Sequence, residues 1–105
     1  MSSVLVPDSK VKTKKHLRKE FKRPSMYKVI MLNDNYTTME FVVDILKNIF
    51  QKTAAQANKI MLNIHHNGSG IAGVYTYDIA HTKVKQVHDK AEKSGFPLKC
   101  ILEKE

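Results

Sequence analysis

The chain has 105 residues, of which 42% are hydrophobic and 27% are charged, and its formal net charge is +8. This length allows one domain with one hydrophobic core, and the composition is too apolar for a chain that is disordered throughout. The longest apolar run has four residues, at 29–32, whereas a membrane-spanning helix needs about 18 or more.

The positive charge is concentrated at the start of the chain. Residues 1–24 hold eight Lys or Arg and two acidic residues, a net charge of +6, whereas residues 25–105 have a net charge of +2. Few large apolar residues lie in the first segment, so we predict a flexible, basic N-terminal extension over residues 1–24. A nucleic-acid-binding arm is the alternative, although Phe21 is the only aromatic residue available there for stacking on bases.

No signal peptide is expected, because the first residues lack a basic start followed by a long apolar stretch. The single cysteine, Cys100, cannot form an internal disulfide, which is typical of a reducing compartment. We therefore expect a cytoplasmic protein that does not enter a membrane.

The folded part begins with a predicted strand over residues 27–32, which is rich in strand-forming side chains and ends at the turn-forming run Asn33-Asp34-Asn35. Thr37-x-x-Glu40 then matches a helix capping box. Apolar residues follow at helical spacing up to Phe50, so we predict a first helix that begins at Thr37.

A second helix is predicted between two clear boundary signals. Thr53-x-x-Gln56 repeats the capping pattern, and Asn67-Gly68 supplies a left-handed stop. A second strand should follow over residues 71–77. Within it, Gly73 indicates either a β-bulge or a close approach of two backbones.

A third helix is predicted to begin near Asp78 and to end at Ser94-Gly95-Phe96-Pro97, where glycine and proline stand in their favoured order. Residues 98–103 then form the last strand. The resulting order, β-α-α-β-α-β, indicates an α+β fold: a small three-stranded antiparallel sheet covered on one face by three helices. We expect a monomer, because no predicted helix has a long apolar stripe left exposed once it covers the sheet.

Catalysis is poorly supported by the sequence. Cys100 lies in an apolar strand, which favours a buried core residue over a nucleophile. His81 and His88 are two helical turns apart, too far for one ion. The adjacent His65 and His66 would point about 100° apart on a helix. We therefore predict no catalytic residue, no metal site and no cofactor, and hence a protein that is not an enzyme.

The turn at Asn33 and Asp34 has two interpretations. Such residues commonly cap helices and form turns. They could also present oxygen acceptors to a small ammonium group, whose three N–H donors need three acceptors and gain from a carboxylate charge. Met39 and Met61 could likewise be core residues or the lining of an adaptable apolar pocket. Composition and spacing leave both questions open.

Two long runs and four shorter motifs carry a resemblance to a known family. The runs are RPSMYKVI at 23–30 and LNDNYTTMEFV at 32–42, and the motifs are MLNIH at 61–65, GVYT at 73–76, TKV at 82–84 and PLKC at 97–100. In order and spacing they closely resemble the ClpS family of bacterial adaptors. The resemblance covers residues 23–105, so residues 25–105 are interpreted as a ClpS-like adaptor core domain.

This resemblance implies an adaptor for N-degron substrates. Such an adaptor holds a protein by its free N-terminal residue (Leu, Phe, Tyr or Trp) and delivers it to the N-terminal domain of a Clp AAA+ unfoldase and to the ClpP protease. Residues that match the unfoldase-contacting surface of the family are Asp78 and Lys83. The partners implied are therefore the unfoldase and N-degron proteins or peptides, and not nucleic acid.

The resemblance also implies a substrate site. Residues that match the family's α-amino-binding positions are Asn33, Asp34 and His65. Those that match its hydrophobic pocket are Thr37, Met39, Val42, Met61, Ile64 and Leu98. Met39 is expected to crowd β-branched first residues such as Ile and Val. The chain departs from the family pattern at Asn35, where aspartate is common, and at Thr38, where proline is frequent.

Overall fold

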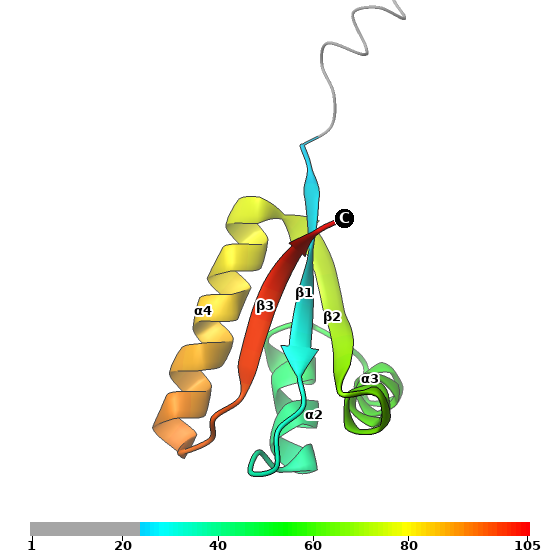
Figure 1. The fold of residues 1–105 in the computed structure, drawn as a ribbon, viewed down its shortest axis with the longest axis vertical. Helices are drawn as coiled ribbons and strands as arrows, with labels where there is room; N and C mark the ends of the chain where they lie inside the picture. The colour runs from blue at the N-terminus through cyan, green and yellow to red at the C-terminus, as the bar shows by residue number, and fades with distance from the viewer. Residues whose placement is uncertain (1–23) are drawn as a thin grey trace, which may run out of the picture.

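The computed structural model describes residues 24–105, so nearly all of the predicted N-terminal extension lies outside the described residues. The elements are β1 (Met26–Leu32), α2 (Met39–Asn48), α3 (Ala54–Asn67), β2 (Ser69–Thr76), α4 (Tyr77–Ser94) and β3 (Lys99–Lys104). The predicted α+β order, β-α-α-β-α-β, is confirmed (Figure 1).

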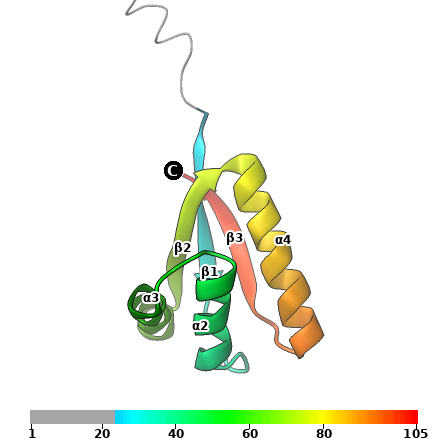
Figure 2. The same cartoon turned by 180° about the vertical axis from the view of Figure 1, so that it is seen from behind.

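The three strands form one antiparallel sheet in the order β2-β1-β3, so that the first strand lies in the middle. All three helices lie on the same side of the sheet, as the view from behind shows (Figure 2). Alternation along β1 turns Val29 and Met31 into the core, where both are fully buried. Ile45 and Leu46 of α2 are buried against them in the same core.

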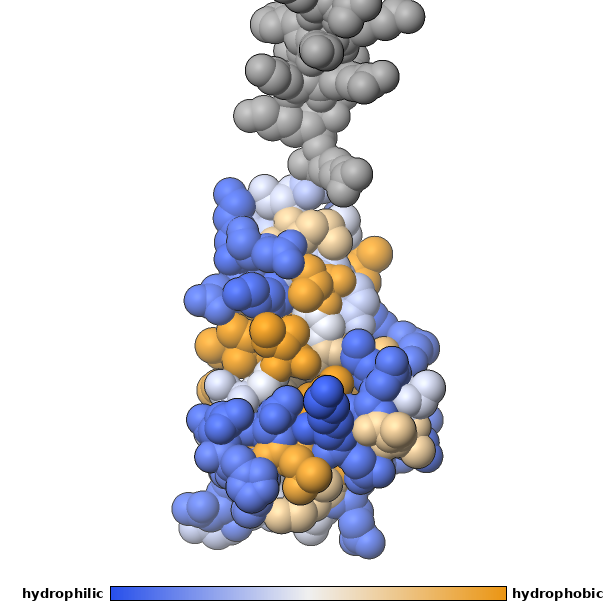
Figure 3. Space-filling view, turned by 90° about the vertical axis from the view of Figure 1, so that its right-hand side faces the viewer, coloured by the Kyte–Doolittle hydropathy of each residue, from blue (hydrophilic) through white to orange (hydrophobic). Residues whose placement is uncertain are grey.

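The opposite face of the sheet is open. Hydrophobic side chains are exposed on the side of the molecule that carries β2 and α3 (Figure 3), and those of β2 are Ile71 and Val74. Ile71 pairs with Ile30, which in turn pairs with Ile101 across the three strands. One face therefore packs on helices while the other remains accessible.

The predicted boundary signals of α3 and α4 are confirmed. Both hydrogen bonds of the Thr53–Gln56 capping box form, with donor–acceptor distances of 3.1 Å and 3.0 Å. Gly68 ends α3 at a φ of 89° and Gly95 ends α4 at 78°, in the left-handed region that glycine adopts without a steric penalty.

The predicted start of the first helix was one residue early. The residue that caps α2 is Thr38, whose hydroxyl oxygen accepts a hydrogen bond from the backbone N–H of Phe41 at 3.1 Å. Thr37 is instead held in the preceding turn, because its hydroxyl and its backbone N–H both donate to the carboxylate of Asp34 at 2.7 Å. A local acceptor thus competes with the cap and shifts it along the chain.

Gly73 lies at a β-bulge, one of the two features that the sequence suggested; its close neighbour is the Tyr75 side chain and not a second backbone. The register between β1 and β2 shifts at this point, from Val29 opposite Gly73 to Ile30 opposite Ile71, which is a β-bulge. A side-chain carbon added at Gly73 would also lie 2.5 Å from the Tyr75 hydroxyl oxygen. Only glycine leaves room for that ring.

Cys100 is a core residue, as predicted, with 5% of its surface exposed. Burial raises the pKa of its thiol to about 12, so the thiolate that a nucleophile needs is scarce at neutral pH. Its backbone N–H donates to Nε2 of His88 at 3.0 Å. That contact joins the edge strand β3 to α4.

Within residues 24–105, no helix combines the length and the hydropathy that crossing a bilayer demands.

Candidate functional site

A cavity of about 230 Å³ lies between the loop that follows β1, the start of α2 and the end of α3. Its lining residues are Asn33, Asp34, Asn35, Thr37, Met39, Val42, Met61, Ile64 and His65. Eight of the nine residues predicted for the substrate site are therefore brought together in one place. At about 30 Å³ per water molecule, the volume suits several waters or one large side chain.

One backbone contact joins the two segments that form the polar side of this cavity. The N–H of Asn33 donates to the carbonyl oxygen of Gly68 at 2.9 Å. Gly68 is the C-cap of α3, and His65 lies in the last turn of that helix. The contact therefore fixes the loop of Asn33 and Asp34 beside an imidazole that is about thirty residues away in the sequence.

The carboxylate of Asp34 organises the loop. One oxygen, Oδ1, accepts the backbone N–H groups of Tyr36 at 2.8 Å and Thr37 at 2.7 Å, and Oδ2 accepts the Thr37 hydroxyl. Two lone pairs of Oδ1 are thus used. Oδ2 retains one lone pair for a further donor.

These hydrogen bonds also set the charge of Asp34. Partial burial raises the pKa of its carboxyl, but the hydrogen bonds from Thr37 and Tyr36 outweigh burial, and the pKa lies below its ordinary value of 3.8. A carboxyl whose pKa is lowered by folding stabilises the fold above its unfolded pKa and loses this contribution as the pH falls through the folded value. Asp34 is therefore a carboxylate at every pH from about 5 upward.

The other side of the cavity is apolar. Val42 and Ile64 are buried, the latter with 2% of its surface exposed, and Met61 is half-buried beside them. Met39 has 45% of its surface exposed. The cavity thus combines a rim of oxygen and nitrogen acceptors with an apolar floor and a flexible thioether side chain.

Close packing holds α3 against the sheet at this point. A side-chain carbon added at Gly70 of β2 would lie 2.8 Å from Cγ1 of Ile64. Because real Cβ atoms do not approach other atoms so closely, any larger residue at position 70 must displace Ile64. The position of the cavity floor therefore depends on the absence of a side chain at Gly70.

Leu98 does not line this cavity. It is buried in the core, with 3% of its surface exposed, and borders a different hollow together with His88, Glu92, Phe96, Pro97 and Lys99. In its place, Asn35 lines the cavity. Sequence reasoning placed Asn35 in the turn-forming run and marked it as a departure from a family pattern, but assigned only its neighbours Asn33 and Asp34 to the site.

The two residues predicted for the unfoldase contact lie at the start of α4, where they line a shallow groove with Ile79, Thr82 and Gln86. Asp78 is exposed in the first turn. Lys83 is directed into the protein instead.

The ammonium group of Lys83 is engaged within the chain. It donates to the carbonyl oxygen of Ile49 at 2.6 Å and to the side chain of Gln51 at 3.2 Å. It also lies 5.2 Å from the centre of the Tyr75 ring and 5.8 Å from that of Phe50, within the range of a cation–π contact. Lys83 thus secures the C-terminal end of α2, where carbonyl oxygens lack helical partners.

Within residues 24–105, no group of three or more His, Cys, Asp or Glu side chains is arranged to hold a metal ion.

Comparisons with known proteins point in one direction. Residues 22–101 match the family model described as ATP-dependent Clp protease adaptor protein ClpS. The chain is 54% identical over 92 residues to the ATP-dependent Clp protease adapter protein ClpS of Acetivibrio thermocellus. The aligned residues make up 88% of this chain and 93% of that protein. This chain is 52% identical over 98 residues to ClpS 2 of Bradyrhizobium diazoefficiens, covering 93% and 87% respectively.

A solved structure resembles the fold. It is that of Agrobacterium tumefaciens ClpS2 bound to L-phenylalaninamide, with a TM-score of 0.76 and 41% sequence identity. The match covers 79% of this chain and 100% of that one.

Proposed function

The chain belongs to the ClpS family of ATP-dependent Clp protease adaptor proteins, and on that premise we propose that it binds the free N-terminal residue of N-degron substrates and delivers them to a Clp AAA+ unfoldase and ClpP. The observation that carries this proposal is one cavity that unites an acceptor rim with an apolar floor. L-phenylalaninamide, the ligand of the Agrobacterium structure, is a free α-amine attached to one large side chain, which is the chemistry that such a cavity would select.

The rim would bind the α-amino group. An N-terminal amine has a pKa of about 7.7–8.0 and is mostly protonated at neutral pH, so it offers three N–H donors and a positive charge. The matching acceptors are the side-chain oxygen of Asn33, the remaining lone pair of Asp34 Oδ2 and a ring nitrogen of His65. An amide nitrogen inside a chain has neither the charge nor the donors to satisfy them.

The apolar floor would bind the first side chain. Burying a Leu or Phe side chain contributes about 1.5–3 kcal/mol, so large apolar residues should be favoured. Val42, Met61 and Ile64 would contact the substrate's side chain deep in the cavity, and Met39 would lie beside its Cβ atom. This arrangement supports the preference for Leu, Phe, Tyr and Trp.

The proposal is tested by peptides that differ only in their first residue. We expect peptides that begin with Leu, Phe, Tyr or Trp to bind about 10- to 150-fold more tightly than the same peptide beginning with Gly, because 1.5–3 kcal/mol of burial is gained. Fluorescence anisotropy with a label at the far end measures this. Placing one Gly before the Leu is the control and should abolish the advantage. Equal affinities across the series would exclude the proposal.

A substitution at Met39 tests how β-branched residues are rejected. We expect Met39→Ala to raise the affinity of Ile- and Val-initiated peptides relative to Leu-initiated ones by about tenfold, because removing the thioether frees space beside Cβ. Competition binding with the three peptides gives the ratio. Leu62→Ala is a matched control, since Leu62 is similarly exposed but lines no part of the cavity. An unchanged ratio in Met39→Ala would show that Met39 does not exclude these residues.

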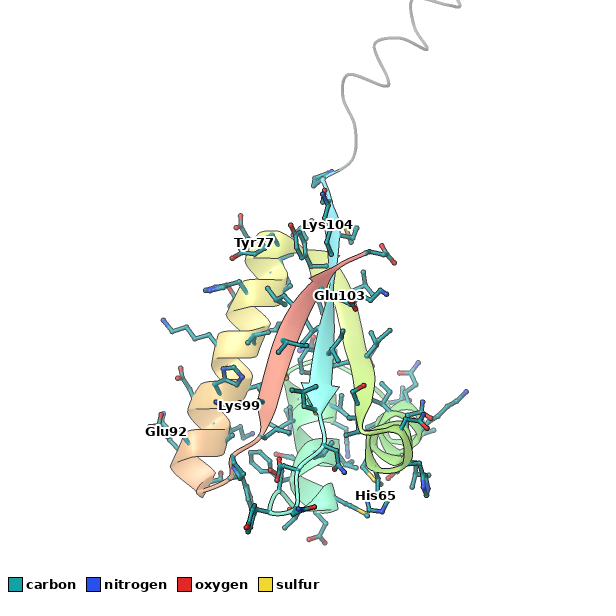
Figure 4. All side chains as sticks on the ribbon, in the orientation of Figure 1. His65, Tyr77, Glu92, Lys99, Glu103 and Lys104 are labelled. Carbon is teal, nitrogen blue, oxygen red and sulfur yellow. The ribbon has the colours of Figure 1, made fainter. Side chains whose placement is uncertain are left out.

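For the unfoldase, we propose a contact with its N-terminal domain at the groove that Asp78 and Ile79 line at the start of α4. Asp78 is accessible for an ion pair, and Ile79 is half exposed. Lys83 would contribute mainly by supporting the groove, because its ammonium is already engaged. The first residue of α4, Tyr77, lies at the opposite end of the molecule from His65 (Figure 4). The chain could therefore hold substrate and unfoldase at once.

A further inference from the structure

A second hollow borders the same loop. It has a volume of about 200 Å³ and is lined by Leu32, Asn33, Asp34, Pro97 and Lys99. It shares Asn33 and Asp34 with the substrate cavity. Lys99 begins β3 and His65 lies in the last turn of α3, and the chain that leaves β1 passes between them (Figure 4). We call this second hollow the Lys99 groove.

We propose that the Lys99 groove receives the second and third residues of the bound substrate and that Lys99 selects acidic side chains there. This inference rests on the proposed function, which places the substrate's amine at Asn33 and Asp34. Consecutive Cα atoms are about 3.8 Å apart, so residues 2 and 3 remain within reach of any surface that borders those two side chains. The Lys99 groove is such a surface.

The charges around the groove favour an acidic occupant. Asp34 and Lys99 are the two charged residues among those that line it. When an ammonium group binds Asp34, the negative charge is balanced, and the positive charge of Lys99 remains. Lys99 is exposed and, among residues 24–105, has no acidic partner within 4 Å, whereas Lys90 of α4 pairs with Asp44 of α2. A carboxylate of the substrate would supply the missing partner.

The expected preference is modest, because the groove is open to water. A charge pair about 6 Å apart in a water-like dielectric corresponds to roughly a threefold change in affinity. The change should shrink at high salt, where the screening length falls to about 3 Å at 1 M. The contribution of the first residue to the binding affinity should persist at 1 M salt, because it comes mainly from burial of apolar surface.

The test compares Leu-Ala-Ala, Leu-Asp-Asp and Leu-Lys-Lys peptides of otherwise identical sequence by anisotropy. For the unaltered protein we expect Leu-Asp-Asp to bind about threefold more tightly than Leu-Ala-Ala, and Leu-Lys-Lys about threefold more weakly. Lys99→Ala should remove this order, and Lys99→Glu should reverse it. Lys85→Glu is the control, because Lys85 is exposed on α4 and lines neither hollow.

The outcomes separate this inference from the proposed function. If Leu-Ala-Ala binds, but Lys99→Glu leaves the order of the three peptides unchanged, the role of Lys99 is refuted and the N-terminal site stands. If Lys85→Glu shifts the order as strongly as Lys99→Glu, the effect is one of net charge and the groove is not a subsite. If Leu-Ala-Ala itself fails to bind, both proposals are overturned.

Discussion

Acetylating the α-amino group of a Leu-initiated peptide is expected to weaken its binding by more than about 100-fold. The acetyl group removes the positive charge and two of the three N–H donors. Hydrogen bonds that involve a charged group contribute about 1.5–3 kcal/mol each, so losing two of them corresponds to at least about 150-fold. Asn33, Asp34 and His65 would then face a neutral amide that cannot satisfy them.

Anisotropy or isothermal titration calorimetry of the free and acetylated peptides measures the effect. The control is the same peptide acetylated only on the side chain of an internal lysine, which adds the same group and removes the same charge at a distance from the N-terminus. That peptide should bind like the unmodified one. Equal affinity of the N-acetylated and free peptides would rule out recognition of the amine and leave only the apolar cavity.

Substituting Asp34 should have the next largest effect. We expect Asp34→Asn to weaken all N-degron peptides alike by about 10- to 150-fold, because it removes the carboxylate charge but keeps the size of the side chain. Asp34→Ala should weaken them further, since it also releases the hydrogen bonds from Tyr36 and Thr37 that fix the loop. The ratio between Leu- and Phe-initiated peptides should stay constant in both variants.

Asp89→Asn provides the matched control for these variants. Asp89 is exposed on α4 and lines no part of the cavity, so the same loss of one negative charge should leave affinity unchanged. Thermal unfolding distinguishes a lost contact from a lost fold, because Asp34→Asn should bind weakly while it remains folded at the assay temperature. Wild-type affinity in folded Asp34→Asn would remove the carboxylate from the site.

Apolar periodicity and caps predicted most of the fold, because these signals are local. The Thr53–Gln56 box and the glycines at 68 and 95 need only their own neighbours to form, and the structure places them as predicted. Thr37 failed as a cap for a reason the periodicity does not contain. Thr37 and Thr38 are both residues that could cap the helix. Asp34 accepts a hydrogen bond from Thr37, and Thr38 is the residue that caps α2.

The candidate site likewise has one part that neighbouring residues predicted and another that depends on residues far apart in the sequence. Asn33, Asp34 and Thr37 are close in sequence, so a turn with acceptors could be read directly from the residues. His65 lies on another helix, and residues alone did not join it to that turn; the resemblance to a family did. The joining contact is a backbone hydrogen bond between Asn33 and Gly68, to which no side chain contributes. The inward orientation of Lys83, likewise, depends on a carbonyl oxygen thirty-four positions away.

The nucleic-acid alternative rested on the basic charge of residues 1–24. All eight of these lysines and arginines lie outside the described residues. Residues 25–105, with a net charge of +2, supply the cavity and both grooves considered above.

Gly70 lines no part of the substrate cavity, yet its close contact with Ile64 limits how selectivity can evolve. An added methyl group there would push Ile64 toward the neighbouring cavity and leave Asn33 and Asp34 unaltered. The preference for particular first residues of a substrate could therefore change during evolution while binding of its α-amino group is retained. A mutational library confined to the cavity walls would miss this position, and a homologue with a bulkier residue there should be compared with this chain only after its equivalent of α3 has been superposed.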